Sequence, residues 1–402
     1  MAMLRNLHSA PTDFSERSVY KGGAYPPAFL EYAWYVNLLY MFLGQVWGII
    51  IPSVGGAIWA LVAAGCLLSV HSQARLVYKP VAWALCAGIL VIAIQVLFHG
   101  VAESVWRAGI DFVAWIAMLI TAQALCLRPQ FLQRFALVTL AIGVACVPFI
   151  QVRPSGNVMR AWASGTGIGN PNGMGLWFGF CTVYCVFWGF HSQKPTQRTV
   201  LWTMAAGCFF MVLLSVSRAP LVAILLACVV GARSVLKRGY VPLLLFTIFV
   251  CIVYMVGLFD EWLDYYTARG TEETGRSALW AAGMERFLAA PWFGYGLNDV
   301  KVLRAGNLLA NPHNGPIHIA LGAGIFPAIC FMIYVTKAVI GAFRVMRGGY
   351  VGETALILPL VVFALIEVMI LDYAFMSPWV VVVFGLAARV GESSLGQRRV
   401  VF

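Results

Sequence analysis

A histidine in a turn-rich stretch is the first residue whose type and setting could carry chemistry. His313 lies in Asn311-Pro312-His313-Asn314-Gly315-Pro316, where proline, asparagine and glycine favour a turn. Its imidazole can take up a proton near neutral pH, which is what a general base must do. The alternative is a loop histidine that bonds only to backbone groups. His318 follows at the start of a predicted helix, where packing or capping is expected.

Four arginines could form an anion site if the fold brings them together. Arg218 stands between two apolar runs, Arg276 follows a glycine, and Arg153 and Arg160 lie in a short outer loop. A guanidinium group binds phosphate oxygens through two hydrogen bonds, so several of them favour a ligand with two phosphates. In the structural alternative, an acid within the membrane region, Glu367 or Asp372, pairs with Arg218.

A glycine-rich stretch and two asparagines are weaker candidates for ligand contact. The segment from Gly165 to Gly173 reads GTGIGNPNG, which predicts a tight turn that lets backbone N–H groups approach an anionic or polyol ligand. Asn172 in this turn and Asn314 beside His313 are the side chains expected to bind substrate. The chain has no Asp-x-Asp pair and no Walker-type phosphate loop, so we expect no metal, no other cofactor and no use of ATP.

The composition predicts the kind of scaffold that must position these residues. Of 402 residues, 61% are hydrophobic and 11% are charged, with a mean hydropathy of +0.84. Soluble domains carry about 25% charged residues, so a soluble enzyme is excluded. One span takes about 20 apolar residues, which predicts an all-α polytopic membrane protein with about twelve transmembrane helices. The net charge of +11 is assigned to cytoplasmic loops, so no nucleic acid partner is expected.

The distribution of positive charge predicts the orientation. With the N-terminus inside, 18 of the 27 Lys and Arg residues fall on the inner side, so both termini are expected in the cytoplasm. The expected organisation is a cytoplasmic segment (1–32), nine spans (33–258), a large outer loop (259–314), three spans (315–390) and a cytoplasmic tail (391–402). The fifth span is expected at 135–152 and the tenth at 316–336. The ten cysteines fall within apolar runs, so no disulfide framework is predicted.

The outer loop contains a predicted amphipathic helix. From Thr274 apolar residues recur every fourth position, with Arg276, Glu285 and Arg286 interleaved, and Pro291 with the Gly294/Gly296 pair ends the pattern. Such a helix either lies at the membrane surface or covers the spans.

These pieces, in this order, resemble the O-antigen ligase and polymerase family of bacterial envelope glycosyltransferases. The resemblance runs from about residue 150 to 340. The matching pieces are the turn at 165–172, Ser217-Arg218, Gly275-Arg276-x-x-x-Trp280, Pro291…Gly294-Tyr295-Gly296 and His313-Asn314. The ligase pattern His-[Asn/Ser/Gln]-x9-Gly-x-x-[Gly/Thr/Tyr] is met at His313, Asn314 and Gly324 but not at Pro327.

The resemblance implies a function and a site. It implies a GT-C-like inner-membrane enzyme, with its active site at the periplasmic face. The enzyme transfers O-antigen from undecaprenyl diphosphate to a sugar hydroxyl of lipid A–core, without a metal and with inversion. The donor lipid, the lipid A–core acceptor and membrane lipids would be its partners. His313 is then the catalytic base, and Arg218 and Arg276 bind the diphosphate; Arg153 and Arg160 join them on topology alone. The alternatives are a polymerase of the same family and, from another class, a secondary transporter or flippase.

Overall fold

The structure is a computed structural model. It describes residues 25–44, 46, 52–100, 103–155, 158–236, 276–304, 308–347 and 355–398. The predicted ninth span (240–258) and the first part of the predicted outer loop lie outside these residues.

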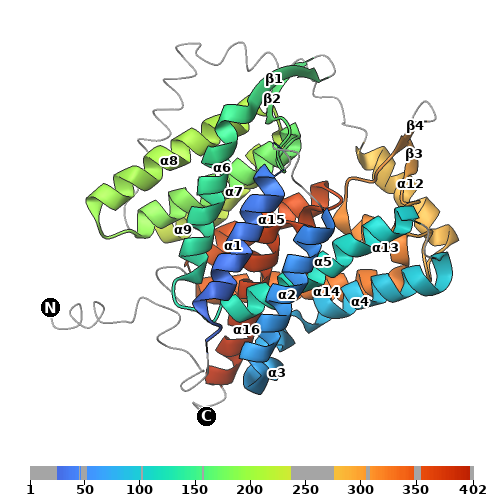
Figure 1. The fold of residues 1–402 in the computed structure, drawn as a ribbon. Coiled ribbons are helices and arrows are strands. Elements are labelled where there is room, and N and C mark those ends of the chain that lie inside the picture. The colour runs from blue at the N-terminus through green and yellow to red at the C-terminus, as the bar shows by residue number, and fades with distance from the viewer. Residues whose placement is uncertain are drawn as a thin grey trace.

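Helices dominate the described part of the chain (Figure 1). Five helical segments there are long and apolar enough to cross a membrane, which confirms a mainly helical polytopic membrane protein. The α-helices are α1 (Ala28–Leu43), α2 (Pro52–Ser69), α3 (Ala74–Tyr78), α4 (Ala82–Ile94), α5 (Glu103–Leu125), α6 (Phe131–Cys146), α7 (Pro171–His191), α8 (Pro195–Leu214), α9 (Arg218–Leu236), α12 (Arg276–Ala289), α13 (Gly315–Ala323), α14 (Ile325–Arg347), α15 (Ile357–Ile370) and α16 (Pro378–Arg398).

Two short antiparallel hairpins were not predicted. Strands β1 (Ile150–Ser155) and β2 (Val158–Ala163) pair in one, and β3 (Val302–Arg304) and β4 (Leu308–Ala310) pair in the other. The fifth span therefore ends before residue 152, because α6 stops at Cys146 and the chain enters β1 at Ile150. Pro148 in the connecting turn lacks the N–H that a continuing helix needs.

The predicted tenth span is two helices rather than one. The chain breaks at Gly324, whose φ of 84° lies in a region that glycine adopts easily and other residues avoid. The short helix α13 precedes the break and the long helix α14 follows it. Apolar periodicity cannot show such a break, because both helices are apolar.

Helix α15 packs against α7, α9, α13, α14 and α16, and most of its residues are buried. The contact between its neighbours α14 and α16 relies on small residues. Gly341 of α14 faces Gly391 of α16 at backbone contact, and a Cβ at Gly341 would overlap the carbonyl of Ala387. Small residues at helix crossings are how membrane helices approach closely.

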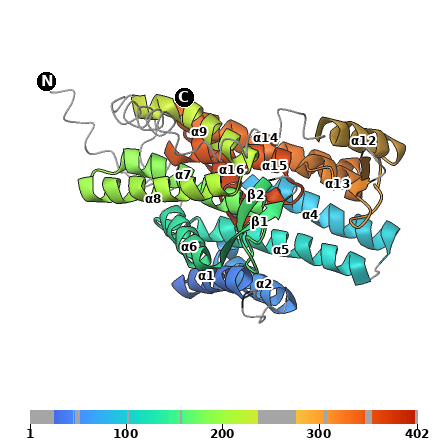
Figure 2. The same cartoon turned by 90° about the horizontal axis from the view of Figure 1, so that it is seen from above.

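We call the end of the bundle with both hairpins and α12 the hairpin end, and the opposite end, near α3, the α3 end (Figure 1). Figure 2 shows the helices of the bundle from above the hairpin β1–β2.

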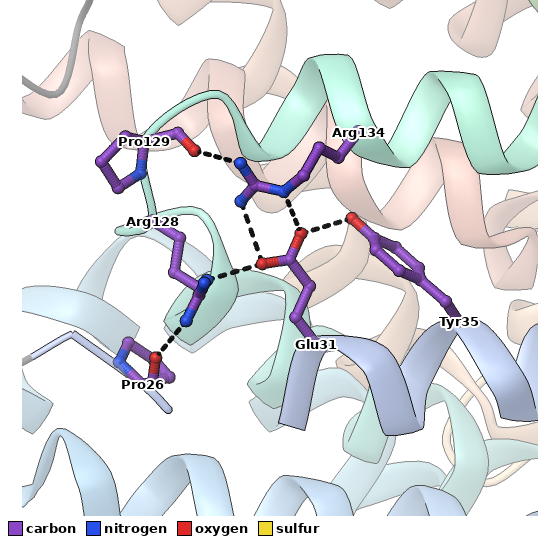
Figure 3. Close-up of polar contacts among 6 residues, drawn as sticks. All are labelled: Pro26, Glu31, Tyr35, Arg128, Pro129 and Arg134. Atoms are coloured by element: carbon purple, nitrogen blue, oxygen red, sulfur yellow. Dashed lines mark hydrogen bonds and ion pairs between the residues drawn. The ribbon is translucent and has the colours of Figure 1, made fainter. Parts of the chain in front are cut away.

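One buried carboxylate joins the start of α1 to the loop before α6 (Figure 3). Glu31 is 2% exposed, and its oxygens lie 2.6 Å from Arg128 Nε and 2.7 Å from Arg134 Nε. Tyr35 Oη donates a third contact at 2.7 Å, and Arg128 also donates to the carbonyl of Pro26. A buried charge is tolerated when cations and hydrogen bonds satisfy it, and here two arginines hold one carboxylate.

We expect Glu31→Gln to lower the stability of the protein by about 3 kcal/mol, because two partly buried guanidinium groups lose their counter-ion. The thermal unfolding midpoint of detergent-solubilised protein, followed by tryptophan fluorescence, would measure the loss. Glu285→Gln, an exposed carboxylate on α12, is the matched control. An equal midpoint for both variants would contradict the anchoring role of Glu31.

Candidate active site

His313 contacts an acid at the hairpin end of α15. Its Nδ1 atom lies 3.3 Å from Asp372 Oδ2, and the imidazole is 42% exposed while the carboxylate is 6% exposed. The other oxygen of Asp372 accepts a hydrogen bond from the backbone N–H of Asn314 at 3.2 Å. The carboxylate therefore contacts the side chain of His313 and holds the next peptide group.

The backbone around His313 is fixed from several directions. His313 has a φ of 50°, which is uncommon for a residue with a side chain. Asn314 caps α13 by accepting the N–H of Ile317 at 3.1 Å, and its amide donates to the carbonyl of Met369 at 3.2 Å. The predicted substrate-binding side chain Asn314 is thus used to join α13 to α15. Such over-determined, uncommon backbone is typical of functional sites.

His318 and Tyr373 complete the surroundings of Asp372. His318 is fully buried, 4.0 Å from the carboxylate, and its ring lies against the ring of Tyr373 with centroids 4.5 Å apart. This matches the expectation that His318 packs. Burial, followed by the charges of Asp111 and Asp372, raises the pKa of Tyr373 to about 12. The phenol therefore stays protonated at neutral pH and can donate a hydrogen bond.

Arg276 lies near a second acid, Glu367 of α15. Glu367 is fully buried, its oxygens have no hydrogen-bond partner within the described residues, and Arg276 at the start of α12 acts on it electrostatically. The guanidinium of Arg276 is half-buried. Asp372 contacts His313, and Arg276 acts electrostatically on Glu367. A pairing of either acid with Arg218 stays a prediction.

The glycine-rich turn meets the junction between α8 and α9. Arg160 donates from Nε to the carbonyl of Ser215 at 2.9 Å and from Nη2 to Asn172 Oδ1 at 3.1 Å. Ser217 donates to the same oxygen of Asn172 at 3.0 Å. The structure therefore gathers Arg160, Asn172 and Ser217 directly before Arg218. These donors of Arg160 are used by the protein, and its contact with a diphosphate stays a prediction.

The junction itself has an unusual backbone. Val216 has a φ of 47°, a conformation rare for a β-branched residue. The turn carries Ser217 and then Arg218, which is half-buried at the first position of α9. One residue with positive φ lies two positions before Arg218 and another is His313 itself, so this backbone feature occurs at both positions that the sequence singled out.

Arg153 is placed differently from the other three arginines. It is exposed on β1 and lies directly opposite Arg160 of β2 in the hairpin. Facing like charges are unfavourable across a strand pair, so the arrangement requires Arg160 to be bonded elsewhere, as it is. A ligand role for Arg153 stays a prediction.

The motif Pro291…Gly294-Tyr295-Gly296 packs against the break between α13 and α14. The N–H groups of Tyr295 and Gly296 donate to the carbonyls of Leu321 and Gly322 at 2.7 and 3.1 Å, and Ile325 donates to the carbonyl of Pro291 at 2.8 Å. The segment for which an amphipathic helix was predicted is α12, with Leu279, Gly283 and Phe287 buried. The segment from Pro291 to Gly296 therefore joins the end of α12 to α13, the helix that follows His313.

Sequence reasoning missed the role of Asp372. It was considered only as a partner of Arg218, although an acid at the end of a long apolar run was a usable signal. Within the described residues, no group of three or more His, Cys, Asp or Glu side chains could hold a metal ion.

The fold and this cluster define a class: a polytopic membrane protein that places a histidine–aspartate contact and several arginines near one end of its helices. Residues 200–332 match the sequence model of the O-antigen ligase family, and this region includes Arg218, Arg276 and His313. The match covers a third of the chain; it confirms the resemblance and supports an enzyme of the ligase and polymerase kind. No curated protein matches the chain.

We expect Gly324→Ala to destabilise the protein by at least about 2 kcal/mol, because its φ of 84° disfavours a side chain. A Cβ would also overlap the carbonyl of Trp292. Gly207→Ala in α8, where a Cβ meets nothing within 4 Å, is the control and should change stability by no more than about 1 kcal/mol. Thermal unfolding in detergent compares the two, and equal midpoints would show that the break tolerates a side chain.

Proposed function

We propose that the protein is an O-antigen ligase of the bacterial inner membrane. It transfers O-antigen from undecaprenyl diphosphate to a sugar hydroxyl of lipid A–core, at a site on the periplasmic face. The hairpin end is then periplasmic, both termini are cytoplasmic, and the chain has about twelve spans in a GT-C-like arrangement. The observation that carries the proposal is the contact between His313 and Asp372 inside an O-antigen ligase family chain.

The contact suits a general base. Asp372 Oδ2, 3.3 Å from Nδ1, favours the tautomer that keeps its proton on Nδ1, which leaves Nε2 unprotonated. The acceptor hydroxyl gives its proton to Nε2 as its oxygen attacks the anomeric carbon. The bond from that carbon to the diphosphate oxygen breaks on the opposite side, and the anomeric configuration inverts. In this step Asp372 acts through His313 and is a positioning residue.

The leaving diphosphate gathers negative charge, which is where the arginines act. Arg218 and Arg276 are half-buried at the starts of α9 and α12, so each guanidinium is joined by the positive end of a helix. Fixed positive groups in a water-poor site stabilise developing charge strongly. Arg160 and Asn172 support the turn that carries Arg218, and Arg153 would meet the diphosphate only from the surface of the hairpin.

The test uses purified protein in detergent, with lipid-linked O-antigen and rough lipopolysaccharide, in EDTA and without nucleotide. Laddered lipopolysaccharide is the expected product. Lengthening of the lipid-linked glycan alone would make the protein a polymerase, the second candidate, since both activities occur in this family. If neither product forms, a secondary transporter or flippase becomes the favoured function.

We expect His313→Ala to lower the transfer rate by at least about 10²-fold, because the hydroxyl loses its proton acceptor. The unfolding midpoint should stay near that of the parent protein. His71→Ala, an exposed histidine at the α3 end, is the control and should keep full activity. Full activity of the His313 variant would exclude it as the base.

We expect Asp372→Asn to lower kcat by about 10²-fold with a small change in KM, because the amide no longer fixes the proton-bearing nitrogen of His313. Initial rates over a range of acceptor concentrations separate the two constants. Asp372→Glu should recover part of the rate, since a carboxylate returns. A rise in KM with an unchanged kcat would assign Asp372 to acceptor binding instead.

A further inference from the structure

At the α3 end the surface holds a groove that the proposed reaction does not use. It encloses about 590 Å³ along α3, the short 3₁₀ turn Lys79–Val81, and α4. We call it the α3–α4 groove. The residues that line it are Ala74, Arg75, Tyr78, Lys79, Ala82, Leu85, Cys86, Ile89 and Leu90.

Its lining changes from basic to apolar along one face. Arg75, Lys79, Ala82, Cys86 and Ile89 are all exposed and follow one another at intervals of three or four residues. That spacing places them in a single row on a helix. The row therefore begins with two cations and continues with three small or apolar side chains.

The length of the row fits one leaflet of a bilayer. From Arg75 to Ile89 a helix rises about 21 Å, while the hydrocarbon of one leaflet is about 15 Å thick. With the cations at the membrane surface, the apolar part of the groove reaches the depth of a whole acyl chain. Ile89 is 58% exposed, so the far end of the groove stays open to the hydrocarbon.

Electrostatics at the basic end favour an anion. Glu392 is the acid found beside it, and its oxygens lie 3.9 Å from Lys79 Nζ and 3.5 Å from Lys337 Nζ. Because Lys79 is exposed, its ion pair with Glu392 is weak. Behind the groove wall, the buried guanidinium of Arg389 donates to the carbonyls of Val77 and Gln123. Among the described residues no salt bridge neutralises Arg389, so its charge adds to that of Arg75 and Lys79.

We propose that the α3–α4 groove binds an anionic phospholipid of the bilayer, with its phosphate at Arg75 and Lys79 and one acyl chain along Ala82, Cys86 and Ile89. Basic pockets between membrane helices recognise such headgroups, and each cation near the surface contributes about equally. The bound lipid covers exposed side chains of α4, whose neighbour α14 follows the proposed active site. The proposal does not depend on the reaction proposed above.

The experiment uses the full chain in nanodiscs of phosphatidylcholine that contain phosphatidylglycerol, with native mass spectrometry to count the phosphatidylglycerol that each protein retains. The parent protein should retain phosphatidylglycerol in preference to phosphatidylcholine. Arg75→Gln/Lys79→Gln should weaken this retention on the order of tenfold or more. Lys194→Gln/Arg347→Gln removes the same charge from exposed positions outside the groove and should leave retention unchanged.

A second variant tests the groove separately from its charge. Ala82→Phe keeps both cations but fills the path of the acyl chain, so retention should fall here too. If Ala82→Phe retains phosphatidylglycerol normally, or if the control double variant loses as much as Arg75→Gln/Lys79→Gln, the protein attracts anionic lipid through general surface charge and the groove is not a site. Displacement by soluble glycerol phosphate at equal concentration would likewise overturn the role of the acyl chain.

Discussion

The organisation of this protein follows from the cost of placing charge in an apolar chain. Only 11% of its residues are charged, and an unpaired buried carboxylate is expensive. Two buried acids of the described residues are therefore informative, because Glu31 lies beside two arginines and Asp372 beside an imidazole. Asp372 is the one on which the candidate site depends, because it holds the side chain of His313 and the backbone of Asn314 together. Through this carboxylate the loop before α13 is tied to the end of α15, which packs against α7, α9, α13, α14 and α16.

A second buried carboxylate, far from the candidate active site, is paired with cations, and there the pairing anchors the fold. Glu31 is enclosed by Arg128, Arg134 and Tyr35, so every contact of that carboxylate goes to structure. Arg160 is likewise bonded to Ser215 and Asn172. Arg218 and Arg276, the proposed ligand-binding arginines, lie half-buried at the starts of α9 and α12.

The sequence predicted the helical membrane scaffold because composition and apolar runs report directly on burial in lipid. It also predicted a helix where α12 lies, from the every-fourth-residue pattern. It could not show the hairpin after α6 or the break at Gly324, because both depend on backbone conformation within apolar segments. It named His313, Asn314, Arg160 and Asn172, but not which of them touch. Asp372 is 59 positions from His313, and only tertiary packing brings the two together.

The depth of each group at the hairpin end bears on how an anionic ligand would bind there. Glu367 is fully buried and Asp372 is 6% exposed, whereas His313 is 42% exposed and the two arginines are half-buried. An anion that arrives from the surface thus meets guanidinium and imidazole groups before it meets either carboxylate. Asp372, 3.3 Å from His313 Nδ1, is close enough to orient the imidazole and is much less exposed than the ring. The burial of Glu367 therefore keeps its side chain away from an anion that approaches Arg276 from the surface.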